Sequence, residues 1–258
     1  MCKQEMRAAT EAERKALGVP PAYTNVMVSI DAKADLVATA RIPNGKTFYK
    51  YSQAFIEGQA AKKWDRVKKL GAKVERIEAR IERDCETGSS EAMCAKLILL
   101  TGMRNGGEPQ GKGESFGASS LQVRHARVVG STIVLDFIGK KGVPQHYEVR
   151  NADLAAYFAK RMSGAKGGDA IFQHDAHSTL RYLKSIGAQK VHDLRTWRAN
   201  EIASALVTEL LKNGMPEGKK AIKAFQKAVA VKVAEVLGNS PSQAMKSYID
   251  PRVWSSIE

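Results

Sequence analysis

The hydrophobic pattern of this chain changes near residue 52, and that change limits the folds open to it. Before residue 52 the pattern is strand-like, and Pro43-Asn44-Gly45 gives a strong hairpin signal. Three strands are expected, at 25–30, 36–42 and 46–51. They predict a small antiparallel sheet, preceded by a short charged helix over residues 1–17.

Beyond residue 52 apolar residues recur at helical spacing, with Gly71 as a break. Further helices are expected at 89–101, 151–163, 178–186, from 192 onward, and at 219–237. Between them lie three strand-like runs, at 121–128, 131–137 and 145–149. The sequence therefore predicts an α+β fold, with an N-terminal antiparallel β domain over 1–62. A larger, mainly α-helical domain with a three-stranded β element follows over 63–258.

The charge of the chain is strongly positive, with 41 Lys and Arg against 27 Asp and Glu, a formal net charge of +14. Such an excess favours a polyanionic partner, nucleic acid before membrane. We find no signal peptide and no apolar run long enough to span a membrane. Cys2, Cys85 and Cys94 are odd in number and lack metal-ligand spacing, which favours a reducing, cytoplasmic setting.

The C-terminal stretch 236–251 restarts a helix immediately after ending one. Gly238 suits a helix C-terminus, and Ser240-Pro241 suits the start of the next helix. Tyr248 lies two turns further on and is either a packing residue or a nucleophile. The choice between these two roles depends on residues upstream.

Two motifs resemble a nucleotide-binding loop and a metal site, but neither matches closely enough to predict one. The glycine-rich loop 105–117 nearly matches a nucleotide-binding P-loop, but Gly113 stands where Ser or Thr would hold magnesium. Strand-like sequence follows this loop, where a P-loop needs a helix. His174-Asp175-Ala-His177 is one short loop and makes no convincing metal site. We expect neither a cofactor nor a metal.

Four side chains capable of phosphate chemistry follow one another along the second domain. Arg104 follows a Leu-rich helix, and Lys140 lies in a tight turn between strands. Arg195 lies near the start of a helix, where the helix dipole favours anions, so a phosphate bound there would explain its position. Tyr248 completes the set near the C-terminus.

In these motifs the chain resembles the type IB DNA topoisomerases, in their compact bacterial and poxvirus-like branch. The resemblance runs from about residue 19 to 251. The motifs that carry it are Thr101-Gly-Met-Arg104, Phe137-Ile-Gly-Lys140, Asp193-Leu-Arg195-Thr-Trp, Gly238-Asn-Ser-Pro-Ser and Lys246-Ser-Tyr248.

The resemblance implies a role for each of these side chains. Tyr248 would attack a DNA phosphate and form a 3′-phosphotyrosine, although a phenol with a pKa of about 10 is a poor nucleophile on its own. Arg104 and Arg195 would stabilise the transition state, each by roughly 3 kcal/mol. Lys140 would protonate the departing 5′-oxygen, worth about a hundredfold or more. The family requires neither ATP nor a divalent metal.

The first domain resembles the DNA-clamping β domain of the same family, through Val19-Pro-Pro-Ala-Tyr and the run 45–51. The resemblance implies a monomer that closes around duplex DNA, associated with nucleoid, viral or host DNA. Basic and aromatic residues on one strand suit contact with phosphate and sugar. Lys46, Tyr49 and Tyr51 are the residues we expect to make such contacts.

Two positions depart from the pattern of the family. Asn239 stands where the family usually has His, and its amide can donate to a phosphate oxygen only without charge. Charged hydrogen bonds are roughly twice as strong as neutral ones, so a slower cleavage step is expected. His192 stands where Lys is usual. Its ring either supplements phosphate binding or simply occupies the helix start.

Two other interpretations stay open. His192-x-x-Arg195 is the pattern of tyrosine site-specific recombinases, which share the catalytic fold and the nucleophile. Those enzymes usually carry a helical domain in place of the β domain expected here. The other interpretation is a catalytically silent DNA-binding relative, which Asn239 alone supports.

Overall fold

The computed structural model describes residues 5–107 and 115–257 and divides into two compact units, Met1–Asp65 and Arg66–Glu258. The division falls inside helix α2 (Gln53–Gly71), which also contains the boundary expected at 62/63. Across the described residues, no helix is long and apolar enough to cross a membrane.

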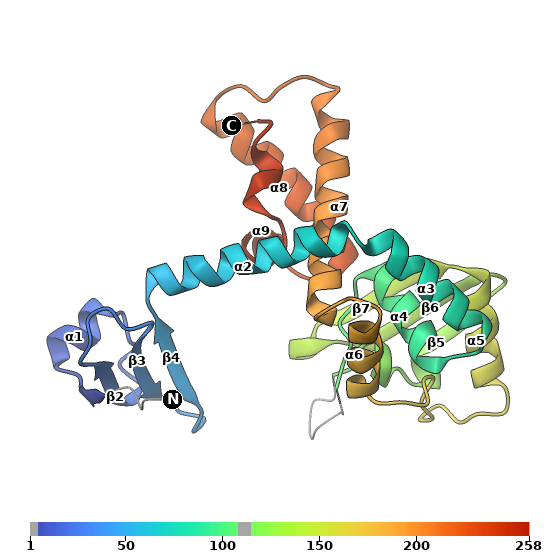
Figure 1. Ribbon diagram of the computed structural model, residues 1–258, viewed down its shortest axis with the longest axis horizontal. Helices are drawn as coiled ribbons and strands as arrows, with labels where there is room; N and C mark the ends of the chain where they lie inside the picture. Colours follow the sequence, from blue (N-terminus) through green and yellow to red (C-terminus); the bar gives the residue numbers. More distant parts are fainter. Residues whose placement is uncertain (1–4, 108–114, 258) are drawn as a thin grey trace. The chain divides into compact units, whose positions relative to one another are not determined.

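The first unit is built on a four-stranded antiparallel sheet in the order β1-β2-β3-β4 (Figure 1). Gly45, in the expected hairpin between β3 and β4, adopts a φ of +80°, which glycine tolerates without strain. Val19, Val26 and Ala40 form a small buried core beneath the sheet. The strands are β1 (Met6–Ala8), β2 (Thr24–Ser29), β3 (Leu36–Arg41) and β4 (Thr47–Tyr51).

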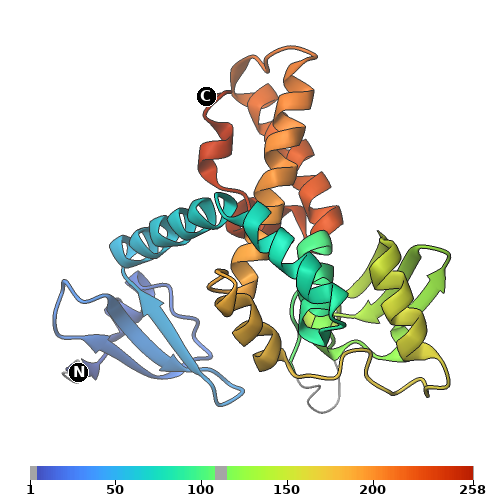
Figure 2. The ribbon, with the colours of Figure 1, turned by 45° about the vertical axis from the view of Figure 1, so that its right-hand side comes forward.

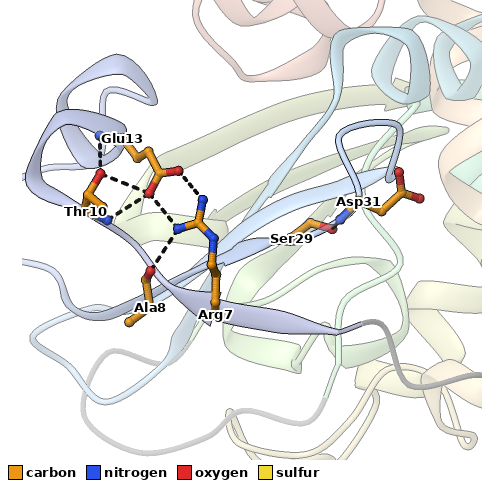
Figure 3. Close-up of polar contacts among 6 residues, drawn as sticks. All are labelled: Arg7, Ala8, Thr10, Glu13, Ser29 and Asp31. Atoms are coloured by element: carbon orange, nitrogen blue, oxygen red, sulfur yellow. Dashed lines mark hydrogen bonds and ion pairs between the residues drawn. The ribbon is translucent and has the colours of Figure 1, made fainter.

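The expected helix over residues 1–17 is wrong in its first half. Met6–Ala8 pairs with β2 as an edge strand, and only Glu11–Ala16 forms a helix, α1. Thr10 and Glu13 form a capping box that fixes where α1 begins. Arg7 donates to both carboxylate oxygens of Glu13 (Figure 3), and this bond lowers the pKa of Glu13 to about 2.

The second unit combines helices with a three-stranded antiparallel sheet in the order β5-β6-β7 (Figures 1 and 2). The strands are β5 (Ala126–Val129), β6 (Thr132–Ile138) and β7 (Pro144–Arg150). The helices are α3 (Val74–Glu86), α4 (Ser90–Thr101), α5 (Ala152–Met162), α6 (Ala176–Ser185), α7 (Val191–Leu211), α8 (Gly218–Leu237) and α9 (Pro241–Ser247).

The strand expected at 121–128 is shorter than predicted. Only its last residues join β5, and two short 3-10 turns, Ala118–Ser120 and Val123–His125, precede them. The backbone N–H groups of Val123 and Arg124 donate to the carbonyls of Asp169 and Gly167 instead of to a strand. A distant loop therefore takes the hydrogen bonds that a longer β5 would have made.

Helix α4 is the centre of the larger hydrophobic cluster. Ser89 caps it by accepting from the N–H of Ala92. The residues Ala92–Leu99 are buried on every face, whereas Leu100, near the end of the helix, is 41% exposed. A helix that is buried all round is held on several sides. α3, α5, α6, α7 and β7 all pack against α4.

A second hydrophobic cluster joins α7, α8, α9 and the C-terminal turn. α7 and α8 lie side by side (Figures 1 and 2), and Ala203 and Val233 are fully buried in this cluster. Helix α7 belongs to both clusters, because Leu194 packs in the first and Ala199 in the second. The start of α7 therefore lies where the two clusters meet.

The start of α7 is held by a two-pronged ion pair. Nε and Nη2 of Arg66 donate to the two carboxylate oxygens of Asp193, at 3.0 and 3.1 Å. Asp193 lies in the first turn of α7, and its side chain is only 4% exposed. Removing one partner of a buried pair leaves the other charge without compensation, which is costly.

We predict that Arg66→Ala lowers the free energy of unfolding by about 3 kcal/mol, because Asp193 stays buried and unpaired. Urea unfolding followed by tryptophan fluorescence measures the change. Arg80→Ala, which removes an exposed pair with Asp84 at 2.9 Å, is the matched control. It should lose only about 0.5 kcal/mol. Equal losses in the two variants would contradict this role of Arg66.

Candidate active site

Three helix ends meet at one place in the second unit. α4 ends at Gly102 and α8 ends at Gly238, both with positive φ, at +66° and +57°. A Cβ atom on Gly102 would lie 3.0 Å from the Cδ2 atom of Leu237, so the ends of α4 and α8 are in contact. The first turns of α7 reach the same place through Arg195, which bonds to both ends.

Arg195 is buried between these ends, with only 1% of its surface exposed. Its Nη1 donates to the carbonyl of Gly102 at 2.6 Å, and its Nη2 donates to the carbonyl of Leu237. Carbonyls at helix C-termini carry partial negative charge, so they stabilise the guanidinium. Its Nε is buried without a hydrogen-bond partner. A guanidinium has five N–H donors, so donors remain for a ligand.

No carboxylate among residues 5–107 and 115–257 forms an ion pair with Arg195. Asp193, two residues away, is engaged by Arg66 instead. A buried charge without an opposite charge is unfavourable unless hydrogen bonds or a bound counter-ion compensate it. The site is therefore suited to an anion.

Tyr248 lies against this guanidinium at the end of α9. The ring centroid of Tyr248 is 5.1 Å from Cζ of Arg195 and 5.2 Å from the ring centroid of His192, which is stacked at 24°. Tyr248 is 3% exposed and belongs to the second hydrophobic cluster. The structure thus brings Tyr248, Arg195 and His192 together.

Asn200 fixes the backbone at Tyr248 and directly after it, and the sequence analysis missed this residue. Its Nδ2 donates to the carbonyl of Tyr248 at 2.8 Å, and its Oδ1 accepts from the N–H of Asp250 at 2.7 Å. Asn200 lies five residues after Arg195 on α7, but a lone Asn in a helix carries no signal of such a role. Only the fold reveals its partners.

A cavity of about 460 Å³ lies beside Arg195, with Arg104 and Lys140 on its wall. Its lining contains four residues with basic side chains and no acidic ones among the described residues. The lining residues are Met103, Arg104, Asn105, Gly106, Gly107, Ser115, Phe116, Lys140, Val191, His192 and Arg195. Val191 and His192 belong to the first turn of α7, whose N–H groups favour anions.

Arg104 and Lys140 reach this wall from different elements of the second unit. Arg104 follows the end of α4, and its carbonyl accepts from the N–H of Ala118 at 2.8 Å. Lys140 is exposed in the turn between β6 and β7. Gly139 closes that turn by donating its N–H to the carbonyl of Val143 at 2.8 Å. The cavity therefore collects residues far apart in the sequence.

Asn239 and His192 are the two positions that depart from the family pattern, and both lie in segments that reach Arg195. The amide nitrogen and oxygen of Asn239 are buried without a hydrogen-bond partner. Asn239 does not line the cavity, although it directly follows Gly238 at the end of α8. His192 lines the cavity, and its Nδ1 lies 3.3 Å from Oγ1 of Thr196. A buried amide without a partner is expensive, so Asn239 is suited to a ligand.

Part of the glycine-rich loop lies outside the described residues, including Gly111, Lys112 and the Gly113 of the rejected P-loop. The base of the loop is closed: a Cβ atom on Gly117 would lie 2.5 Å from the carbonyl oxygen of Arg104. In the His174–His177 loop, Asp175 caps α6. No group of three or more potential metal ligands occurs among the described residues.

Lys46, Tyr49 and Tyr51 belong to the first unit, whereas every residue that lines the cavity belongs to the second. All three are exposed, and the tyrosines are 53% and 39% exposed. Tyr49 and Tyr51 are two residues apart on β4, so they lie on the same face of the sheet. The ring of Tyr51 stacks on Phe55 at 4.9 Å between centroids. Exposed aromatic rings of this kind are available for contact with a partner.

Comparison with known proteins identifies the family of this chain. Residues 52–252 match the family model of the eukaryotic DNA topoisomerase I catalytic core. The chain belongs to the type IB DNA topoisomerases. It is an isomerase of the poxvirus-like kind, and its substrate is DNA. This topoisomerase is 26% identical over 256 residues to the DNA topoisomerase 1B of Acanthamoeba polyphaga mimivirus. That match covers 90% of this chain and 75% of the mimivirus protein.

Proposed function

We propose that this topoisomerase relaxes supercoiled duplex DNA by cutting one strand through a 3′-phosphotyrosine at Tyr248. One observation carries the proposal. A buried arginine, Arg195, has no carboxylate partner among the described residues and packs against the Tyr248 ring at the edge of a basic cavity. A DNA phosphate is the anion that this arrangement is best suited to accept.

In the proposed cleavage step, the phenolic oxygen of Tyr248 bonds to the scissile phosphorus and its proton leaves to solvent. The bond between phosphorus and the 5′-oxygen breaks, and Lys140 gives that oxygen a proton. Arg104 and Arg195 donate to the non-bridging oxygens, and each such donor is worth roughly 3 kcal/mol in the transition state. Protonation by Lys140 contributes about a hundredfold or more.

The proposal needs the Tyr248 side chain to turn into the cavity when DNA binds. Tyr248 is not among the lining residues, whereas Arg195 and His192, which both contact its ring, are. Asn200 holds the carbonyl of Tyr248 and the N–H of Asp250. The N–H of Tyr248 donates to the carbonyl of Ala244, so the proposed movement is a rotation of the side chain. His192 then supplements the binding of the phosphate from its place in the cavity wall.

Religation reverses the same step. The 5′-hydroxyl attacks the phosphotyrosine, Lys140 takes up its proton, and Tyr248 leaves. The ester keeps the energy of the broken bond, so the proposed cycle uses neither ATP nor a divalent metal. Between cleavage and religation, rotation of the free 5′ end releases supercoils.

We further propose that the protein acts as a monomer that clamps duplex DNA between its two units. The exposed Tyr49 and Tyr51 and the hairpin residue Lys46 would provide the contacts of the first unit. The net charge of +14 favours binding to a polyanion.

The decisive assay is relaxation of a supercoiled plasmid in EDTA without ATP. The unaltered protein should relax it, and Tyr248→Phe should lower the rate by at least about 10³-fold, because no other group replaces the nucleophile. Tyr157→Phe is the matched control. It also removes a partly buried tyrosine hydroxyl, which donates to Ser90 at 3.0 Å, and because neither residue lines the cavity the rate should stay unchanged.

Gel analysis of the same reaction separates the alternatives. A recombinase would exchange strands between two paired duplexes instead of relaxing one. A silent DNA-binding protein would retain the plasmid without changing its topology. Either result would refute the proposed function.

Asn239 is expected to limit the rate of cleavage. Its amide donates without charge, so Asn239→His should accelerate single-turnover cleavage by about tenfold, near 1.4 kcal/mol. Asn239→Ala should slow it. Asn213→Ala, which alters an exposed asparagine after α7, is the control and should have no effect. Cleavage by Asn239→Ala at the unaltered rate would show that this side chain does not act on the phosphate.

The salt dependence of DNA binding tests the first unit. If Lys46 contacts a phosphate, Lys46→Ala should make the slope of log K against log salt shallower by about 0.9. Lys33→Ala, in the loop before β3, is the control and should leave the slope unchanged. Filter binding or fluorescence anisotropy at several salt concentrations measures both slopes. An unchanged slope in Lys46→Ala would rule out this phosphate contact.

A further inference from the structure

A buried glutamine links the turn that carries Lys140 to the segment that carries Tyr248. Gln145 is the second residue of β7, pairs with Phe137 and is only 7% exposed. Its Nε2 donates to the carbonyl of Gly238 at 3.2 Å, across 93 residues of sequence. The same nitrogen lies 3.4 Å from the carbonyl of Val143, the residue that ends the Lys140 turn, so the amide bonds to both segments.

Two glycines leave the space that this side chain fills. A Cβ atom on Gly139 would lie 2.8 Å from Cγ of Gln145, and one on Gly238 would lie 2.2 Å from its Oε1. Real Cβ atoms do not approach other atoms so closely, so neither position accepts a side chain while Gln145 stays in place. Gly139 directly precedes Lys140, and Gly238 directly precedes Asn239. Gln145 therefore lies between the backbones that position these two residues.

The contacts of Gln145 continue toward Arg195. Its Oε1 accepts from the hydroxyl of Tyr147 at 3.2 Å, and Tyr147 is 8% exposed on the same face of β7. Burial raises the pKa of the Tyr147 phenol, and the nearby Arg195 guanidinium acts in the opposite direction. One row of polar groups thus joins the carbonyl of Gly238, Gln145, Tyr147 and the neighbourhood of Arg195.

We propose that Gln145 is a positioning residue that sets the Lys140 turn relative to the nucleophile segment. This inference rests on the proposed function, because it concerns the proton that Lys140 gives to the 5′-oxygen. Tyr248 and Arg195 have their own supports, in Asn200 and in the two helix ends. Lys140 is exposed in its turn. Loss of the Gln145 link therefore displaces the acid more than the nucleophile.

A change of leaving group reports on this acid alone. With an ordinary 5′-oxygen, the bond to phosphorus breaks and the oxygen takes a proton from Lys140, which becomes a neutral amine. With sulfur at the 5′ position, the phosphorus–sulfur bond breaks and the electron pair stays on a thiolate. A thiol with a pKa of about 8.5 is a far stronger acid than an alcohol, so this thiolate leaves without a proton.

The experiment is single-turnover cleavage of two matched duplexes, one with oxygen and one with sulfur at the 5′ side of the scissile phosphate. Gln145→Leu should slow cleavage of the oxygen duplex by about 10- to 100-fold, as a misplaced acid does. It should cleave the sulfur duplex within about threefold of the unaltered rate, since that reaction needs no acid. Lys140→Ala should show the same split.

Two further variants make the result specific. Gln145→Glu keeps the shape and the acceptor for Tyr147 but removes the donor to Gly238, so it should show the same split. His146→Gln alters the neighbouring residue, which faces solvent and bonds to Asp136, and should cleave both duplexes at the unaltered rate. Cleavage of the sulfur duplex shows that a variant is folded and that its nucleophile is competent.

Three outcomes would overturn the inference. Gln145 variants that are equally slow on both duplexes would act on folding or on the nucleophile, and variants that match the unaltered protein on both would have no role. A Lys140→Ala variant without the split, beside an active unaltered protein, would remove Lys140 as the acid. If the unaltered protein forms no covalent adduct with either duplex, the proposed function itself fails.

Discussion

The arrangement of the second unit depends on one buried guanidinium that bonds to the ends of two helices. Arg195 donates to the last carbonyls of α4 and α8 while it belongs to α7, so it joins three helices at one point. The partial negative charges of those carbonyls stabilise it without neutralising it. A carboxylate partner in place of these carbonyls would also hold the Arg195 side chain. It would, however, cancel the positive charge that attracts an anion. The helix ends keep the fold and the charge together.

Asp193 pairs with Arg66 and not with Arg195, which leaves the charge of Arg195 uncancelled. Arg66 engages both oxygens of this carboxylate, which keeps a negative charge two residues from Arg195 out of the cavity. The pair also holds the first turn of α7 against α2, within the second unit. One ion pair therefore supports the fold and preserves the basic character of the cavity wall.

Local signals in the sequence were enough for most elements and for the order of the four proposed catalytic residues. Gly238 and Ser240 ended and restarted helices where predicted, because caps depend on neighbouring residues. The predictions of helix at Met6–Ala8 and of strand at the start of 121–128 were wrong. Chain segments far away in the sequence decide how these residues pair. Asn200 and Gln145 carry no local signal at all. The bonds that tie them to the segment 238–250 span 48 to 93 residues and form only in the folded chain.

The cavity lies where two hydrophobic clusters meet, and this position has a consequence for the chemistry. Phe137 on β6 and Met103 next to Arg104 pack in the first cluster, whereas Tyr248 packs in the second. A shift of one cluster against the other would change the distance between the proposed acid, Lys140, and the proposed nucleophile, Tyr248. Apolar contacts are non-directional, so they do not fix the orientation of one cluster against the other. Hydrogen bonds fix both a distance and an angle. Two polar links cross the junction, from Arg195 to two helix ends and from Gln145 to Gly238, and in the proposed mechanism they keep the reacting groups at a fixed distance.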